Sequence, residues 1–251
     1  MTQLYPFCSS SKGNCTLLVH RERGLLIDCG ITFRQLERSL ESASLPLSQV
    51  EGLLLTHEHT DHIKALPQLQ KHTTLPIYGG NGTLAAAQAE GISHQNRPFD
   101  VGAFHITPIA TCHDAADPCG YRIEADGKAL AIVTDTGRVT PSMLQYLSGC
   151  SLIMLESNYD PDMLENGPYP AALKRRIRSE QGHLSNGDCA SLLALLALEG
   201  SLKTAVLAHI SDHNNTPLTA KMAALTAFSQ YGIEGVRLEA GGPFCPPLEV
   251  E

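Results

Sequence analysis

The sequence predicts a protein of the α/β class. Short apolar runs alternate with amphipathic segments of helical period along all 251 residues. Apolar residues make up 43% of the chain and charged residues 18%, which is typical of an ordinary globular protein. The length suits one large domain better than two. We therefore expect residues 1–251 to form a single α/β domain.

Seven short runs predict β-strands. They are rich in leucine or β-branched residues and are flanked by Gly, Asp or Ser. Because they are apolar almost throughout, both faces of the sheets they form should be covered. In chain order they are "CTLLV" (15–19), "LLID" (25–28), "GLLLT" (52–56), "FHITPI" (104–109), "LAIVT" (130–134), "LIMLE" (152–156) and "TAVLAH" (204–209).

Six amphipathic segments predict helices between and after these strands. They are Thr32–Glu41, His62–Lys71, Pro141–Leu147, Ala171–Ser179, Asn186–Leu198 and Pro217–Tyr231. A sandwich of two sheets with helices on the outside satisfies this pattern, and so does a single doubly wound sheet.

Charge and composition disfavour several classes of function. The net charge of −8 argues against a broad surface for nucleic acid or anionic membrane. The N-terminus lacks the features of a signal peptide, and no apolar run approaches the ~20 residues of a membrane helix. Eight cysteines without a C-x-x-C spacing indicate free thiols in a reducing compartment. We therefore expect a cytoplasmic protein with no membrane association and no obligate protein partner.

The stretch "LLLTHEHTDHIKAL" (53–66) concentrates metal-binding side chains. Residues two apart in an extended segment point the same way, so His57 and His59 can bind one ion. Asp61 and His62 follow as the chain turns into a helix, which aims them at a neighbouring position. A polar turn with Asp61 as helix cap would use the same letters, but the H-x-H-x-D-H string is a specific one.

Three further polar residues follow apolar strands. His113 lies in "TCHDAADP", Asp135 in "TDTG" and His209 in "AHISDHNN". Singly, each is more typical of a capped or core-satisfied polar group than of a ligand. Together with 57–62 they supply the additional ligands that a site for two metal ions requires.

These motifs, in this order, resemble those of the metallo-β-lactamase-fold hydrolases. The family signature is an early Asp after a strand, then H-x-H-x-D-H, a lone His, a lone Asp and a final His. Here these are Asp28, the 57–62 motif, His113, Asp135 and His209, so the match covers nearly the whole chain. The resemblance implies a four-layer αββα sandwich with the metals at one edge of the two sheets.

The resemblance also implies a ligand set for two divalent metal ions per chain. His57, His59 and His113 would hold one ion. Asp61, His62 and His209 would hold the other, Asp135 would bridge, and Asp28 would orient the ligand loop by hydrogen bonds. Imidazole-rich ligation favours zinc, and the carboxylates also suit manganese or iron.

Two positions inside the motif narrow the chemistry. Position 59 is His where the diiron oxidoreductases of this fold carry Glu, which disfavours redox chemistry. Position 135 is Asp where many true β-lactamases carry Cys, which disfavours that activity. Thioesterases of the glyoxalase II type share both His59 and Asp135 and remain an alternative, as does a cyclic phosphodiesterase.

Two segments favour phosphodiester substrates. A basic run on this acidic chain precedes "GHLS" (182–185), and arginine and lysine suit phosphate oxygens. A solvated helix face explains the same run, and a hairpin turn explains "SSSKGNC" (9–15). His183 resembles the extra histidine that contacts the scissile phosphate in phosphodiesterase members of the fold. The candidate phosphate-binding residues are Lys12, Asn14, Arg175, Arg176, Arg178 and Ser185.

Together the motifs resemble the WalJ (YycJ-like) bacterial subgroup of this fold, which is associated with 5′-exonuclease activity on DNA. One difference is Tyr159 in "ESNYD", where that subgroup leads us to expect His. The resulting hypothesis is a metal-dependent nuclease that uses a metal-bridging hydroxide, with Asp61 and His183 as catalytic residues and DNA as substrate. His183 would stabilise charge on the phosphate or help the leaving oxygen to depart.

Overall fold

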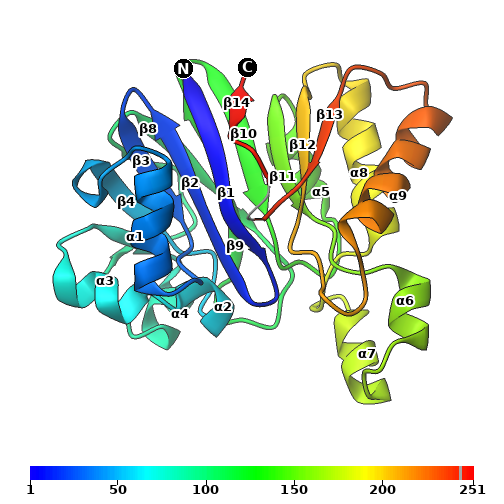
Figure 1. Cartoon of the computed structure of the whole chain (residues 1–251), viewed down its shortest axis with the longest axis horizontal. Coiled ribbons are helices and arrows are strands. Elements are labelled where there is room, and N and C mark those ends of the chain that lie inside the picture. Colours follow the sequence, from blue (N-terminus) through cyan, green and yellow to red (C-terminus); the bar gives the residue numbers. More distant parts are fainter. Residues whose placement is uncertain (243–244) are drawn as a thin grey trace.

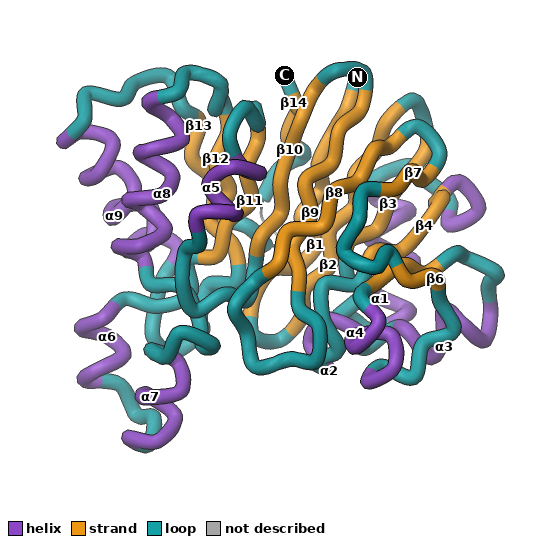
Figure 2. The backbone as a smooth tube through the Cα atoms, turned by 180° about the vertical axis from the view of Figure 1, so that it is seen from behind, coloured by secondary structure: helices purple, strands orange, loops and turns teal. Residues whose placement is uncertain are grey.

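Two mixed β-sheets face each other in the computed structural model, which describes residues 1–242 and 245–251 (Figure 1). The order of the first sheet is β14-β1-β2-β3-β4-β5-β6, and that of the second is β13-β12-β11-β10-β9-β8-β7. Helices cover the outer face of each sheet, as the view from behind also shows (Figure 2). The predicted sandwich is confirmed, and the single doubly wound sheet is excluded.

The strands have the following bounds. The first sheet contains β1 (Thr2–Ser10), β2 (Gly13–His20), β3 (Arg23–Ile27), β4 (Val50–Leu54), β5 (Ile77–Gly79), β6 (Ile92–Ser93) and β14 (Leu248–Val250). The second contains β7 (Phe99–Val101), β8 (Phe104–Ala110), β9 (Cys119–Ala125), β10 (Lys128–Val133), β11 (Leu152–Glu156), β12 (Thr204–Ala208) and β13 (Arg237–Ala240).

The helices over the first sheet are α1 (Phe33–Ser42), α2 (Thr60–Ile63), α3 (Leu66–His72) and α4 (Asn81–Ala86), with a 3-10 turn at Leu47–Gln49. Those on the side of the second sheet are α5 (Pro141–Leu147), α8 (Asn186–Leu198) and α9 (Pro217–Gln230). The short helices α6 (Pro161–Asn166) and α7 (Ala171–Ile177) project below the sandwich in Figure 1. No helix in the described part of the chain is long and apolar enough to span a bilayer.

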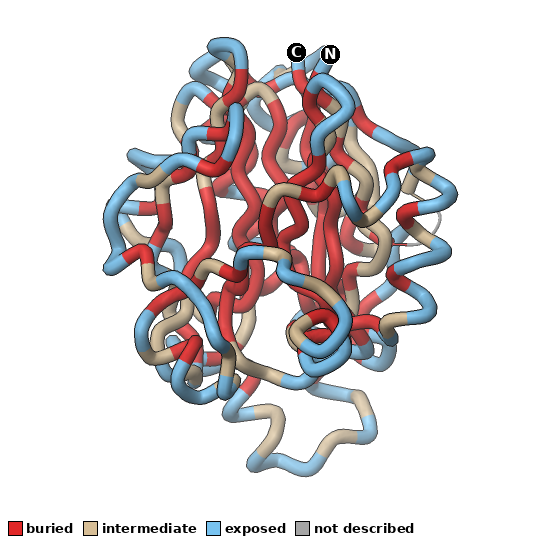
Figure 3. Tube along the Cα trace, turned by 90° about the vertical axis from the view of Figure 1, so that its left-hand side faces the viewer, coloured by how far each residue is buried: buried red, intermediate tan, exposed pale blue. Residues whose placement is uncertain are grey.

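Successive side chains of a strand point to opposite faces of its sheet, and this alternation explains how the sheets pack against each other and against the helices. In β12, Val206 packs into the core between the sheets, whereas Ala205 and Leu207 pack against α8 and α9. Both faces of this strand are therefore apolar, as its sequence predicts. The buried positions gather in the centre of the molecule (Figure 3), and a third cluster lies between the first sheet and α1 and α3.

Several elements differ from the sequence-based expectation. The helix predicted at His62–Lys71 is broken into α2 and α3, and Pro67 lies in the first turn of α3. Strand β1 was not predicted because it contains Pro6 and a bulge between Pro6 and Cys8, which obscure the strand pattern. The predicted strands 25–28 and 204–209 each end one residue early, at Ile27 and Ala208.

The strands deliver their carboxyl ends to one edge of the molecule. β3 and β4 are parallel in the first sheet, and β10, β11 and β12 are parallel in the second. A bridge between Ser10, at the end of β1, and Ile210, just after β12, joins the two sheets at this edge. Residues that follow these strands therefore meet in one place.

Candidate metal centre

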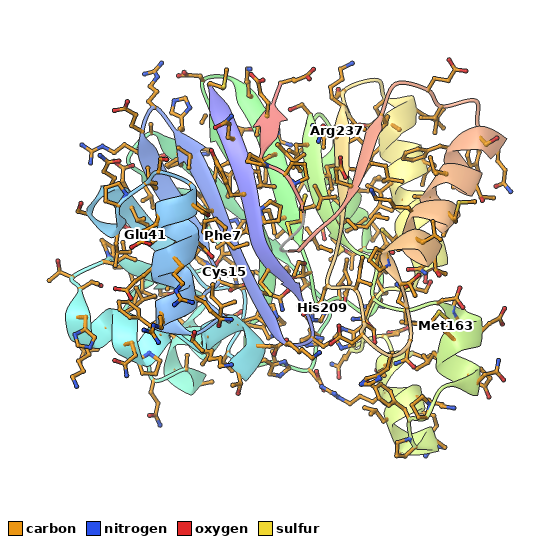
Figure 4. The ribbon with its side chains drawn as sticks, viewed as in Figure 1. Phe7, Cys15, Glu41, Met163, His209 and Arg237 are labelled. Atoms are coloured by element: carbon orange, nitrogen blue, oxygen red, sulfur yellow. The ribbon has the colours of Figure 1, made fainter. Side chains whose placement is uncertain are left out.

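The candidate metal centre lies at this edge, at the lower end of the strands, where Figure 4 labels His209. Every predicted ligand follows a strand: 57–62 follow β4, His113 follows β8, Asp135 follows β10 and His209 follows β12. The structure brings all seven predicted ligands together, in overlapping groups whose ligand atoms lie within 4.8 Å of one another.

Three site residues have left-handed backbone conformations. The φ angles are 58° at Asp28, 58° at Asp135 and 51° at His209. Asp and His tolerate this region better than β-branched or bulky residues do, but it is sparsely populated and costs energy. At Asp28 and His209 the turn ends the strand, which explains why β3 and β12 end at Ile27 and Ala208, one residue earlier than predicted.

The first group consists of the imidazoles of His57, His59 and His113, with ring centroids 4.6 to 5.1 Å apart. His113 Nδ1 donates to the carbonyl of Gly182 at 3.0 Å, which leaves Nε2 directed toward His59. His57 Nε2 is buried and has no hydrogen-bond partner among the described residues. Burial lowers the pKa values of His57 and His113, which keeps both rings neutral and able to bind a cation.

The second group consists of Asp61, His62 and His209. His62 Nδ1 donates to Asp28 Oδ2 at 2.8 Å, so its Nε2 faces the site. His209 Nδ1 contacts Glu156 Oε1 at 2.9 Å, and its Nε2 lies 3.6 Å from Asp61 Oδ2. His209 Nε2 is buried without a hydrogen-bond partner in the described chain.

Asp135 lies between the two groups. Its Oδ2 is 3.2 Å from His62 Nε2, and its Oδ1 is 3.6 Å from His113 Nε2. Burial would raise the pKa of Asp135, but His209 and His62 hold it well below its usual range. An ionised carboxylate therefore stands where it can contact ligands of both groups.

The donor set fits divalent metal ions such as zinc. Imidazole nitrogens and carboxylate oxygens are the ligands that such ions take. Two buried histidine nitrogens beside the other ligands, His57 Nε2 and His209 Nε2, have no hydrogen-bond partner among the described residues. Buried polar atoms are almost always satisfied, so a bound cation would supply the partner that these two nitrogens lack.

Two carboxylates behind the ligands orient them. Asp28 accepts from His62 Nδ1 and also from the backbone N–H and hydroxyl of Thr56, at 2.8 and 2.9 Å. Glu156 orients His209 in the same way, by accepting a hydrogen bond from its Nδ1. Glu156 was not predicted from the sequence as a site residue. The signal was present in the sequence, since Glu156 ends the apolar run "LIMLE" much as Asp28 ends "LLID".

His183 joins the site through the same glutamate. Its Nδ1 lies 2.8 Å from Glu156 Oε1, and its ring is 5.1 Å from that of His113 and 5.2 Å from that of His209. The other oxygen of Glu156 accepts the backbone N–H groups of Thr136 and Leu184. With Nδ1 committed to Glu156, the Nε2 of His183 remains for a ligand.

Segment 9–15 contains two candidate phosphate-binding residues. Asn14 lies inside the site and Lys12 lies outside it. Asn14 is buried, and its Nδ2 lies 3.0 Å from His62 Nε2 and 3.4 Å from Asp61 Oδ2. Lys12 is exposed and pairs with Asp212 at 2.9 Å. The structure thus places Asn14 against the metal ligands themselves.

The remaining phosphate candidates have partners of their own, with one exception. Arg176 makes two hydrogen bonds to Asp114, the neighbour of His113, at 2.6 and 3.0 Å, and Arg178 pairs with Glu165 at 2.6 Å. Ser185 caps α8 by accepting the backbone N–H of Asp188. The guanidinium of Arg175 has no partner among the described residues.

Gly30 is essential to the packing of the ligand loop. A Cβ at this position would lie 1.6 Å from the backbone oxygen of Asp61. We expect Gly30→Ala to lower the free energy of unfolding by about 3 kcal/mol or more, because the ligand loop must move. Thermal and denaturant unfolding would measure this. Gly187→Ala is the matched control, since the nearest atom to its Cβ is 3.8 Å away; equal losses in the two variants would contradict the expectation.

Metal affinity is expected to rise with pH between about 6.5 and 8.5. Burial would lower the pKa of His62, but Asp28 and Asp135 raise it to about 10, so metal-free protein holds this proton at neutral pH. Binding of a metal must displace that proton. Titration calorimetry in buffers of different ionisation enthalpy should show proton release on binding.

The stability of metal-free protein should change in the opposite direction over the same pH range. A raised folded-state pKa stabilises the fold fully below the unfolded value of ~6.5, and this contribution declines as pH rises toward the folded value. Chelated protein should therefore melt at lower temperature at pH 8.5 than at 6.5. An unchanged melting temperature, or binding without proton release, would show that His62 is neutral in the metal-free state.

Comparison with known proteins shows the family of the chain. The family model described as a β-lactamase superfamily domain matches residues 23–210. Exodeoxyribonuclease YycJ of Bacillus anthracis is 34% identical over 89% of this chain and 88% of its own length. Exodeoxyribonuclease WalJ of Streptococcus pneumoniae is 30% identical over 88% of this chain and 86% of its own length.

A solved structure shares the fold. The metallo-β-lactamase-fold protein YhfI of Bacillus subtilis superposes with a TM-score of 0.75 at 20% identity, covering 98% of both chains. The matched family segment, residues 23–210, contains Asp28 and all seven predicted ligands. These findings confirm the resemblance inferred from the motifs: the chain belongs to the β-lactamase superfamily and has the metallo-β-lactamase fold.

Proposed function

We propose that this protein is a phosphodiesterase dependent on two divalent metal ions and that it removes nucleotides from the 5′ end of DNA. The observation that carries the proposal is its 34% identity, over nearly its whole length, to a protein named as an exodeoxyribonuclease. The site supports it, because residues 1–251 supply two ligand groups joined by Asp135, with His183 beside them.

Two ions bound in these groups would neutralise charge on the phosphate and lower the pKa of a bound water. Asp61 is partly exposed, and although burial would raise its pKa, His209 and His62 hold it below its usual value. An ionised Asp61 can accept a hydrogen bond from the attacking water and orient it toward phosphorus.

His183 is placed to act on the phosphate or on the leaving oxygen. Because Nδ1 donates to Glu156, a proton on Nε2 would make that atom the donor that faces the phosphate. This donor can bind a non-bridging oxygen or protonate the leaving 3′ oxygen. One oxygen atom of Glu156 thus contacts both His183, the proposed general acid, and His209, a proposed metal ligand.

The charge distribution favours recognition of a strand end over wrapping of a long strand. The chain carries a net charge of −8, and most of the basic run near the site is already paired. Few phosphates can therefore be contacted at once. The logarithm of the binding constant should fall only shallowly with the logarithm of salt concentration, with a slope near −1 to −3.

The direct test is cleavage by protein loaded with manganese or zinc. The substrates are duplex and single-stranded DNA labelled at either end and the small diester bis-nitrophenyl phosphate. His57→Ala removes a buried ligand, and His72→Ala, an exposed histidine on α3, is the matched control. The proposal expects metal-dependent shortening from the 5′ end that His57→Ala loses and His72→Ala keeps.

Other outcomes point to other activities. Cleavage of the small diester with DNA untouched would favour a cyclic phosphate as substrate. Inactivity on all phosphodiesters with metals bound would overturn the proposal and favour a thioester, for which neither His183 nor the basic run is needed. Shortening from the 3′ end would overturn only the polarity.

A further inference from the structure

A cavity of about 250 Å³ opens directly beside the first ligand group, and no step described above uses it. Its walls come from three segments, those that follow β8, β10 and α7. We call it the side cavity. Its lining residues are Thr111, Cys112, His113, Pro118, Arg138, Glu180 and Gln181. His113 belongs both to this lining and to the three-imidazole group.

The walls of the side cavity are held together by specific contacts. Gly137 N–H donates to the carbonyl of Cys112 at 2.8 Å, and a Cβ on Gly137 would lie 2.3 Å from the carbonyl oxygen of Ser179. The segments after β10 and α7 therefore approach as closely as a glycine permits. The cavity is a consequence of this packing, and not of a loosely placed loop.

Arg138 is fixed along one wall. Its Nε donates to Cys112 Sγ at 3.3 Å, and its terminal nitrogen pairs with Glu180 at 3.1 Å. These two contacts lie at the edge of the guanidinium and leave its flat face free, and such faces stack on nucleic-acid bases. Roughly half of the Arg138 side chain is exposed, so a ligand can reach it.

The charge of the side cavity suits a nucleoside better than a phosphate. Glu180 balances the charge of Arg138, and Gln181 adds a neutral donor and acceptor. Bases and sugars are neutral and edged with hydrogen-bonding groups. The volume lies below the roughly 300–1,000 Å³ of pockets for drug-sized ligands, which fits one nucleoside and not a run of nucleotides.

The position of the side cavity relates it to the reaction. Gln181 is followed by Gly182, which accepts the hydrogen bond of His113, and by His183. A phosphate bound against the edges of His113 and His183, whose rings pack on each other, would therefore have its adjoining nucleoside at the cavity mouth. We propose that the side cavity receives the terminal nucleoside next to the scissile phosphate and that its base stacks on Arg138. This inference rests on the proposed nuclease function and adds what the enzyme recognises.

Equilibrium binding tests the side cavity without requiring DNA cleavage. Calorimetry of zinc-loaded protein would compare deoxyadenosine 5′-monophosphate with inorganic phosphate, which share the charged group and differ in the nucleoside. We expect the nucleotide to bind about tenfold more tightly than phosphate. Arg138→Ala should remove most of this preference, and Arg38→Ala, an exposed arginine on α1, should retain it.

Arg138→Lys separates stacking from charge. Lysine keeps the charge beside Glu180 but lacks the planar group, so we expect the preference for the nucleotide to be lost in this variant as well. Arg138→Lys also provides the test if the Arg138→Ala protein folds poorly. With DNA as substrate, both variants should raise KM about tenfold with little change in kcat. The salt dependence of DNA binding should equal that of wild type, because no phosphate contact is removed.

Three results would overturn the assignment: equal affinity of wild type for nucleotide and phosphate, a full preference retained in Arg138→Ala, or wild-type behaviour of Arg138→Lys. If the proposed nuclease function is wrong, the results differ from these three. Wild type would then leave DNA intact, whereas the binding comparison would still report on the side cavity.

Discussion

Asp135→Asn is expected to lower turnover of bis-nitrophenyl phosphate by about a thousandfold and to reduce bound metal by about one ion per chain. The carboxylate lies within 3.2 to 3.6 Å of nitrogen atoms of His62 and His113, which belong to different ligand groups. Asparagine keeps the shape but loses the charge and one ligand oxygen. Steady-state kinetics together with elemental analysis of the dialysed protein would measure both effects.

Asp100→Asn is the matched control for this variant. Asp100 is exposed in β7 and pairs with His105 on the neighbouring strand, so its replacement should leave metal content and turnover unchanged. Wild-type metal content and turnover in Asp135→Asn would show that this residue is not a ligand, and the assignment of the two groups to a joined site would fail with it.

Glu156→Gln is expected to lower kcat or metal affinity roughly 10- to 100-fold. One oxygen of Glu156 meets the Nδ1 atoms of His183 and His209, and the other accepts two backbone N–H groups. A glutamine has only one acceptor oxygen, so its NH₂ must face two donors in either orientation. A buried donor left unsatisfied in this way also costs about 1–3 kcal/mol of stability.

Turnover measured on folded protein with bound metal separates positioning from a general loss of structure. Without the carboxylate, the Nδ1 atom of His183 loses its partner, so kcat should fall even in Glu156→Gln protein that is folded and loaded with metal. Glu124→Gln, a half-exposed residue paired with Arg122, is the control. A wild-type kcat in folded, metal-loaded Glu156→Gln protein would contradict the role assigned to Glu156 in positioning His183.

The residue types of the site were predictable because their signal is local. A polar group directly after a buried strand is visible in "LLID", "LLLTHEHTDH" and "TAVLAH", and each run delivers its residue to the same edge of the sandwich. Short strands such as β5 and β6, and β1 with its proline, have no such signal. Their place in the sheet depends on neighbours that periodicity does not reveal.

The roles of individual side chains were less predictable. Asn14 could be chosen as a polar residue in a turn, but only its folded position shows that it contacts His62 and Asp61. Ser185 and Lys12 look similar to it in sequence, yet the hydroxyl of Ser185 caps a helix and Lys12 pairs with Asp212. Their role in binding phosphate stays a prediction.

The sequence by itself determined the α/β class, the order of the metal-binding residues and their placement after strands, because strand pattern and residue chemistry are local properties. Only the tertiary structure decided which nitrogen of each histidine faces the site, and that Glu156 orients two of them. Those choices depend on hydrogen bonds between distant residues, such as the one from the His209 backbone to Ser9, 200 positions earlier. No window of sequence contains both partners, so only the folded chain brings them together.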